Sequence, residues 1–200
     1  LMPTRKDSRA AALLESGLRH FQHGRVEQAR QSFEQALQAV PRHPDALHLL
    51  GVIALQDGDH RRATELLQQA IAIRPDQPDY LANLAYGYVG LKRLPEALAA
   101  FERAARLSPN DPDLQIGTGN CLAMLGRMAE AEQVFRSLVE RHPRHALGWF
   151  NLAKSLDDQS RHLEACDLYQ HVIELAPQFA DAYNNLGVAL NRLERFEEAE

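Results

Sequence analysis

The chain has 200 residues, of which 45% are hydrophobic and 24% are charged, a composition typical of a folded protein. Its net charge of −5 argues against nucleic acid as the main partner, because phosphate binding requires a basic surface. The longest apolar runs, such as residues 51–55, are far shorter than the roughly 20 residues that cross a bilayer, and the first residues lack a signal-peptide core. We therefore expect no membrane segment and a cytoplasmic location.

The chain contains two cysteines, Cys121 and Cys166. Two are too few for a disulfide framework. We expect two reduced, partly buried thiols, and a single bridge between them is the alternative.

Proline recurs at intervals of 34 residues along the chain, at Pro41, Pro75, Pro109, Pro143 and Pro177. Three other columns share this period: Gly or Ala at the eighth position of each repeat, Ala at the twentieth, and an aromatic residue or Leu at the twenty-fourth. Placing the proline at the thirty-second position fixes the boundaries, after a lead-in of residues 1–9. The repeats are 10–43, 44–77, 78–111, 112–145, 146–179 and a truncated sixth, 180–200.

Each repeat is predicted to form two helices. Apolar residues recur at helical spacing in its first part, and a turn near the fifteenth position, such as Gly24, separates the two helices. The proline ends the second helix because it lacks an N–H and disfavours helix at the preceding residue. In the sixth repeat we expect a first helix from Ala180 to about Arg192, and a second helix that stops at Glu200 just past Ala199.

The small residues at positions eight and twenty allow two helices to approach closely. The residue at position twenty-four is predicted to fill the groove between one helix pair and the next, as part of the core. These residues are Phe33, Leu67, Phe101, Phe135 and Tyr169.

These columns resemble the signature of the tetratricopeptide repeat family. The fifth repeat supplies the tryptophan form of the motif with Trp149, and the fourth departs from the pattern at Gln115 and Thr118. The resemblance implies an all-α, right-handed superhelical solenoid whose first helices line a concave face that binds a protein or peptide. Because a solenoid needs a polar terminal cap, and the sixth repeat lacks one, we expect the array to continue.

In this family the inward side chains come from positions two, five, six, nine and twelve or thirteen of the first helix. Here they are apolar in the first two repeats and rich in amides from the third onward. A row of Asn side chains can hold the backbone of an extended peptide, and the pattern is similar to the asparagine ladder of O-linked N-acetylglucosamine transferases. The alternative is a set of ordinary solvated polar residues. The predicted peptide-binding residues are Asn83, Tyr86, Asn120, Asn151, Lys154, Asn185 and Asn191.

No catalytic constellation, metal site or cofactor site is predicted. The pairs His20/His23 and His142/His145 have ligand-like spacing, but they fall at helix ends, where capping or surface roles are expected. His48 is interpreted as a polar lining residue, and residues 157–158, two aspartates, as solvated charge.

The leading functional prediction is a non-catalytic interaction scaffold. The alternative is the N-terminal, substrate-recruiting part of a larger enzyme, most naturally a glycosyltransferase. Self-association through the uncapped sixth repeat is a third hypothesis.

Overall fold

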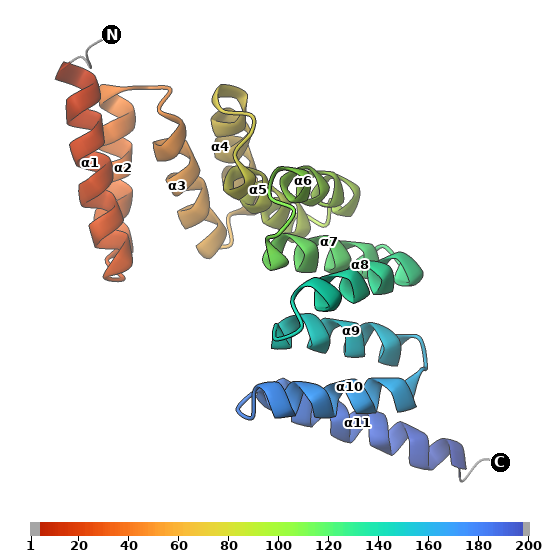
Figure 1. The fold of residues 1–200 in the computed structure, drawn as a ribbon. Coiled ribbons are helices and arrows are strands. Elements are labelled where there is room, and N and C mark those ends of the chain that lie inside the picture. The colour runs from red at the N-terminus through yellow and green to blue at the C-terminus, as the bar shows by residue number, and fades with distance from the viewer. Residues whose placement is uncertain (1–4, 198–200) are drawn as a thin grey trace. The chain divides into compact units, whose positions relative to one another are not determined.

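The computed structural model describes the backbone of residues 5–197 and the side chains up to residue 193. This part of the chain contains eleven α-helices and no strand, which confirms the all-α prediction (Figure 1). The first helices of the repeats are α1 (Arg5–Gln22), α3 (Pro44–Gln56), α5 (Pro78–Gly90), α7 (Pro112–Met124), α9 (Ala146–Asp158) and α11 (Ala180–Glu197). The second helices are α2 (Val26–Ala39), α4 (His60–Ile73), α6 (Leu94–Leu107), α8 (Met128–Arg141) and α10 (His162–Leu175).

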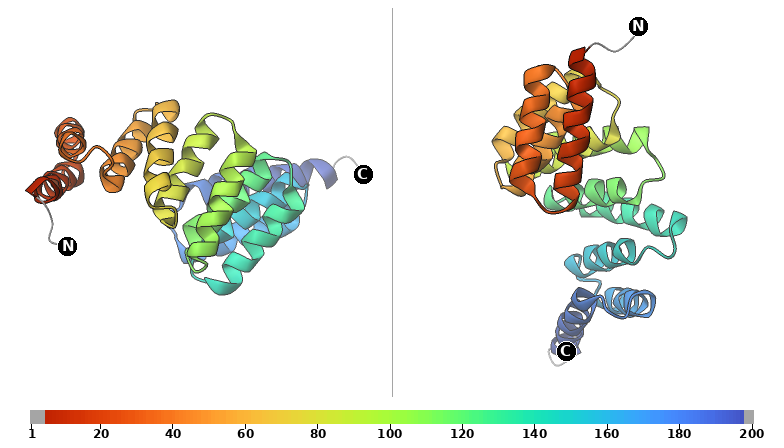
Figure 2. Two further views of the ribbon diagram at one scale, coloured as in Figure 1. Left: turned by 90° about the horizontal axis from the view of Figure 1, so that it is seen from above. Right: turned by 90° about the vertical axis from the view of Figure 1, so that its left-hand side faces the viewer.

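The helices form two compact units, one up to Pro109 with α1–α6 and one from Asn110 with α7–α11. Within each unit, a first helix packs against the second helix of its own repeat, and that second helix packs against the next first helix. The two views in Figure 2 show such a pair, α1 and α2, lying side by side. Each unit is therefore a solenoid segment built from stacked helix pairs.

The predicted repeat boundaries coincide with helix starts. The helices α3, α5, α7, α9 and α11 begin at the first residue of their repeats. The lead-in differs, because α1 begins at Arg5 and so includes part of residues 1–9.

The turn within each complete repeat requires a residue with positive φ at position fifteen. Glycine supplies this conformation without steric cost in three repeats, with φ values of 71° at Gly24 and 77° at Gly58 and Gly126. Lys92 and Ser160 adopt it in the third and fifth repeats, with φ values of 59° and 63°. The turn is thus a property of the repeat geometry, and non-glycine residues adopt it where the packed helix pair holds the backbone.

The sixth repeat does not make this turn, and the predicted end of its first helix near Arg192 is wrong. The helix α11 continues to Glu197, so that Glu194 at position fifteen is helical. A left-handed conformation costs a glutamate about 1 kcal/mol or more, and no packed second helix within the described residues offsets that cost here. The predicted second-helix residue Ala199 lies outside the described residues.

The core is built on the contact between positions eight and twenty-four. A Cβ atom added to Gly119 would lie 2.5 Å from two ring carbons of Phe135, so the glycine allows the ring to lie directly on the first helix. In the first unit, Phe33 also packs in one cluster with Leu47 and Leu50 of the next repeat. The predicted core role of position twenty-four is confirmed, and its contacts lie both within the repeat and between repeats. The buried side chains in this column are Phe33, Leu67, Phe101, Phe135 and Tyr169.

Candidate functional site

The candidate site is the first-helix surface, the name used here for positions two, five, six, nine and twelve of the first helices in each unit. In the unit of α1–α6 this surface is largely apolar. Tyr86 is 49% exposed and Leu18 is 39% exposed, although both occupy helices whose opposite sides are buried. The edge of the Tyr86 ring meets Phe101 at a centroid distance of 5.0 Å, which orients the exposed phenol.

A polar cluster joins the second and third repeats on this surface. Nδ2 of Asn83 donates a hydrogen bond to Nε2 of His48 at 2.8 Å. The His48 ring also stacks on Tyr80, with ring centroids 4.4 Å apart. The hydroxyl of Tyr80 donates to Asp45 at 2.5 Å, and Arg74 donates to the same carboxylate at 2.8 Å. The cluster therefore fixes the orientation of the Asn83 amide.

Burial lowers the pKa of His48, although the nearby carboxylates of Asp79 and Asp45 act in the opposite direction. A neutral imidazole is required for Nε2 to accept the amide hydrogen of Asn83. Burial, together with the hydrogen bond to Asp45, also raises the pKa of Tyr80, so its hydroxyl stays protonated and acts as a donor. The interpretation of His48 as a polar lining residue is thus refined: it positions a neighbouring candidate ligand-binding amide.

The predicted residues of the second unit differ in their availability. Asn120, Lys154 and Asn191 are exposed, and Asn185 is half-buried. Asn151 is only 9% exposed, and its Nδ2 donates to the carbonyl oxygen of Leu147, one turn earlier in α9, at 2.8 Å. One amide donor of Asn151 is therefore engaged within its own helix.

The interpretation of residues 157–158 as solvated charge is wrong for the first of them. Asp157 is buried, and its carboxylate accepts hydrogen bonds from Nδ1 of His162 at 2.6 Å and from Nη1 of Arg192 at 2.5 Å. Asp158 is exposed, as expected. The Asp157 carboxylate, held between an imidazole and a guanidinium, links the fifth repeat to α11. The sequence alone did not indicate this link.

The predicted histidine caps are present at two helix ends. Nδ1 of His23 donates to the carbonyl oxygen of Arg19 at the end of α1, at 2.7 Å. Nδ1 of His145 accepts the backbone N–H of Gly148 at the start of α9, at 3.1 Å. These contacts confirm the capping interpretation for both residues.

Both cysteines are free and buried, rather than partly buried as expected. Burial raises the pKa of the Cys121 thiol to about 11 and also raises that of Cys166. In the described part of the chain, no group of three or more His, Cys, Asp or Glu side chains is placed to hold a metal ion. None of the described helices is long and apolar enough to cross a membrane.

With this geometry established, the chain can be compared with known proteins. A family model described as tetratricopeptide repeat matches residues 14–78, 83–146 and 133–178, and a second model with the same description matches residues 168–200. The chain therefore belongs to the tetratricopeptide repeat family. The comparison with curated proteins gives no significant match.

Solved structures support the fold over most of the chain. The thermophilic TPR protein TTC0263 of Thermus thermophilus is 26% identical, with 90% of this chain and 98% of that chain covered and a TM-score of 0.71. MamA of AMB-1 is 27% identical, with 86% and 94% covered and a TM-score of 0.69. YrrB, described as a TPR protein with an unusual peptide-binding site, is 21% identical, with 90% and 92% covered and a TM-score of 0.74. The YrrB comparison shows the fold alone.

Proposed function

We propose that the chain is a protein-interaction scaffold that binds a segment of a partner protein on its first-helix surface. The observation that carries the proposal is the exposed column at position nine. Leu18 and Tyr86 in this column are 39% and 49% exposed, although α1 and α5 bury their other faces. Val188, in the same column on α11, is also exposed. Exposed aromatic and aliphatic side chains beside polar groups are typical of an interaction surface.

The two units offer different chemistry to a partner. The unit of α1–α6 presents Leu18, Val52 and Tyr86 and suits apolar side chains. The unit of α7–α11 presents Asn120, Lys154 and Asn185, which suit backbone carbonyls, amides or an acidic group. A segment bound to the unit of α1–α6 would accordingly carry apolar anchors, and a segment bound to the unit of α7–α11 would carry polar or acidic groups.

The asparagines differ in how available they are to a partner, because some already make hydrogen bonds within the chain. Asn120, Asn185 and Asn191 are the strongest candidates, since they are exposed or half-buried. Asn83 contributes through the groups that His48 does not engage, and Asn151 contributes least because it is buried and bonded within α9. The likeness to the ladder of O-linked N-acetylglucosamine transferases belongs to this proposal. The likeness concerns the mode of binding, in which asparagine side chains hold the backbone of a peptide. Binding is the only activity proposed for this chain.

The proposal is tested by selecting binding peptides from a random library and measuring their affinity for the original chain and three variants. Tyr86→Ala and Asn185→Ala remove proposed contacts, and each should weaken binding of some selected peptides by about tenfold, equivalent to 1.4 kcal/mol. Leu163→Ala is the matched control, because Leu163 is 70% exposed but lies on the second helix α10. The proposal would be contradicted if the peptides bound both first-helix variants as tightly as the original chain. It would also be contradicted if only Leu163→Ala weakened binding.

A further inference from the structure

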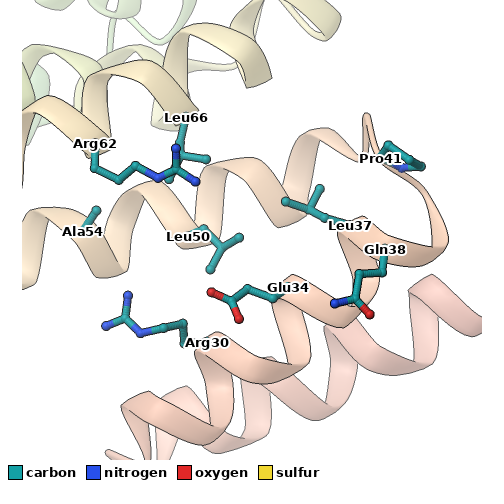
Figure 3. A pocket seen from close by; sticks show the side chains of 9 residues that line it. All are labelled: Arg30, Glu34, Leu37, Gln38, Pro41, Leu50, Ala54, Arg62 and Leu66. Carbon is teal, nitrogen blue, oxygen red and sulfur yellow. The ribbon is translucent and has the colours of Figure 1, made fainter.

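A hollow lies on the side of α3 opposite the first-helix surface, between the second helices α2 and α4 (Figure 3). Its volume is about 480 Å³, within the range of small-ligand sites. Leu50 and Ala54 of α3, Leu37 of α2 and Leu66 of α4 supply its apolar lining. Leu50 and Ala54 occupy positions seven and eleven, half a turn away from the first-helix surface. The hollow is therefore separate from the surface proposed above.

Position eleven of the second repeat, which lines the hollow, is alanine. The same position holds Tyr88, Leu122 and Leu156 in the next three repeats, and each of these larger side chains is buried. In the third repeat the equivalent space is closed by Tyr88, whose hydroxyl accepts a hydrogen bond from Nε2 of Gln68 at 2.8 Å. Ala54, itself 4% exposed, lines the hollow at the position where its counterparts have large side chains.

A second departure from the repeat pattern occurs at the same hollow. Position nineteen holds glutamate in the third, fourth and fifth repeats, and each of those glutamates pairs with the arginine three residues before it. The second repeat reverses both charges. Asp59 stands where the arginine would be and caps α4 through the backbone N–H of Arg62, while the Arg62 side chain extends to the hollow. Its ion pair with Glu65 is long, at 3.8 Å, and exposed, so it costs little to exchange.

The charges around the hollow are unevenly distributed. In Figure 3, the side chains of Arg30 and Arg62 reach one end of it from opposite sides, while Gln38 and Pro41 lie at the other end. Arg30 already donates to Asp57 at 2.7 Å, whereas the ion pair that the Arg62 guanidinium makes among the described residues is the exposed one with Glu65. Glu34 lines the hollow between Arg30 and Gln38 and carries a negative charge, so only the end nearest Arg62 is complementary to a negative group.

We propose that this hollow is a second protein-binding site, which takes a bulky apolar side chain of a partner segment flanked by an acidic residue that pairs with Arg62. The apolar side chain replaces the missing counterpart of Tyr88 over Ala54. In the later repeats an arginine at position sixteen pairs with a glutamate at position nineteen. In the second repeat the arginine is Arg62 at position nineteen, and the acidic residue of the partner segment pairs with it. Two independent departures from the repeat, one in volume and one in charge, thus coincide at one place and define one ligand chemistry.

The test uses the smallest probe with both features, N-acetyl-Phe-Asp-amide, and its isosteric neutral control, N-acetyl-Phe-Asn-amide. Binding to the 200-residue chain is followed by NMR through the backbone amides of Leu50, Ala54 and Leu66. The Asp probe should shift these amides in a saturable way, and the Asn probe should bind at least about threefold more weakly, as expected for the loss of a partly exposed ion pair.

Two variants separate the parts of the proposal. Ala54→Leu installs the residue found at this position in the fourth and fifth repeats and should abolish binding of both probes without lowering thermal stability. Arg62→Glu installs the later repeats' residue on the surface and should remove the preference for the Asp probe. Tyr86→Ala, on the other surface, should leave both affinities unchanged. Unshifted amides, equal affinities for the two probes, or full binding by Ala54→Leu would each overturn the proposal.

Discussion

Nδ2 of Asn83 lies 2.8 Å from Nε2 of His48, so an amide on α5 is held by an imidazole on α3. Because an amide NH₂ group can only donate, the imidazole nitrogen must accept and the ring must be neutral. One of the proposed ligand-binding amides is therefore oriented by the protonation state of a histidine in the preceding repeat.

This contact predicts a pH dependence. Burial lowers the pKa of His48, so the unfolded chain binds a proton more readily than the folded chain near the usual histidine pKa of about 6.5. The stabilisation by neutral His48 is accordingly present above that pH and is lost as the pH falls through the lowered folded-state pKa. An NMR titration of the His48 ring should give a midpoint below about 6.5.

The variant Asn83→Ala should raise that midpoint, because the neutral ring loses its donor. Asn185→Ala, at the same repeat position but distant in sequence, serves as the control and should not change the His48 titration. A midpoint at or above about 6.5 in the original chain would show that the ring is not held neutral.

A second prediction compares two glycines at position eight. Gly119→Ala places a Cβ atom 2.5 Å from ring atoms of Phe135, whereas a Cβ atom at Gly187 meets no atom of the described residues within 4 Å. Alanine favours a helix over glycine by about 1 kcal/mol, so Gly187→Ala should stabilise the chain. At Gly119 this gain is offset by overpacking of about 1–3 kcal/mol.

Chemical unfolding, followed by fluorescence of the single tryptophan, Trp149, measures the stability of both variants. Trp149 lies in the same compact unit, α7–α11, as the two glycines. The cost at Gly119 should lie at the low end, because Ala85 and Ala153 occupy this position in other repeats and are fully buried. Equal shifts in the unfolding midpoint for the two variants would contradict the packing contact between Gly119 and Phe135.

The helix arrangement was largely predictable, because each column of the repeat has one physical role. Proline marks the end of the second helix, and a positive-φ turn at position fifteen marks the end of the first. The prediction failed at α11, where the turn depends on a packed second helix as well as on the local residue. A helix end that is determined by tertiary contact cannot be placed from periodicity alone.

The side-chain partners on the first-helix surface were less predictable. Position six identified Asn83 and Asn151 as inward amides, but not that one bonds to His48 and the other to the carbonyl oxygen of Leu147. Asp157 likewise appeared solvated because its partners, His162 and Arg192, lie in another helix and another repeat. The signal for the hollow was present in the sequence, since Ala54 is the small residue in a column of large ones, but only the packed helices show the hollow that it lines.

The cysteines give a third prediction. Because burial raises the pKa of Cys121 to about 11, little of this thiol is ionised at pH 8, and its side chain is buried. A thiol reagent such as DTNB should react slowly with the native chain and should titrate two thiols after denaturation. Rapid reaction of one thiol in the native chain would show that Cys121 or Cys166 is accessible, and fewer than two thiols after denaturation would indicate a bridge.

The last prediction concerns the carboxylate between His162 and Arg192. Asp157→Asn removes the negative charge that both groups contact, and it leaves the half-exposed guanidinium without its short ion pair. Hydrogen bonds to charged groups contribute about 1.5–3 kcal/mol, so the variant should lose about 2 kcal/mol of stability by Trp149 fluorescence. Asp158→Asn, the exposed neighbour, should stay within about 0.5 kcal/mol of the original chain. Because Arg192 lies on α11, amide hydrogen exchange in α11 should also accelerate in Asp157→Asn and not in Asp158→Asn. If exchange in α11 were unchanged, the carboxylate would not be what couples this helix to the fifth repeat.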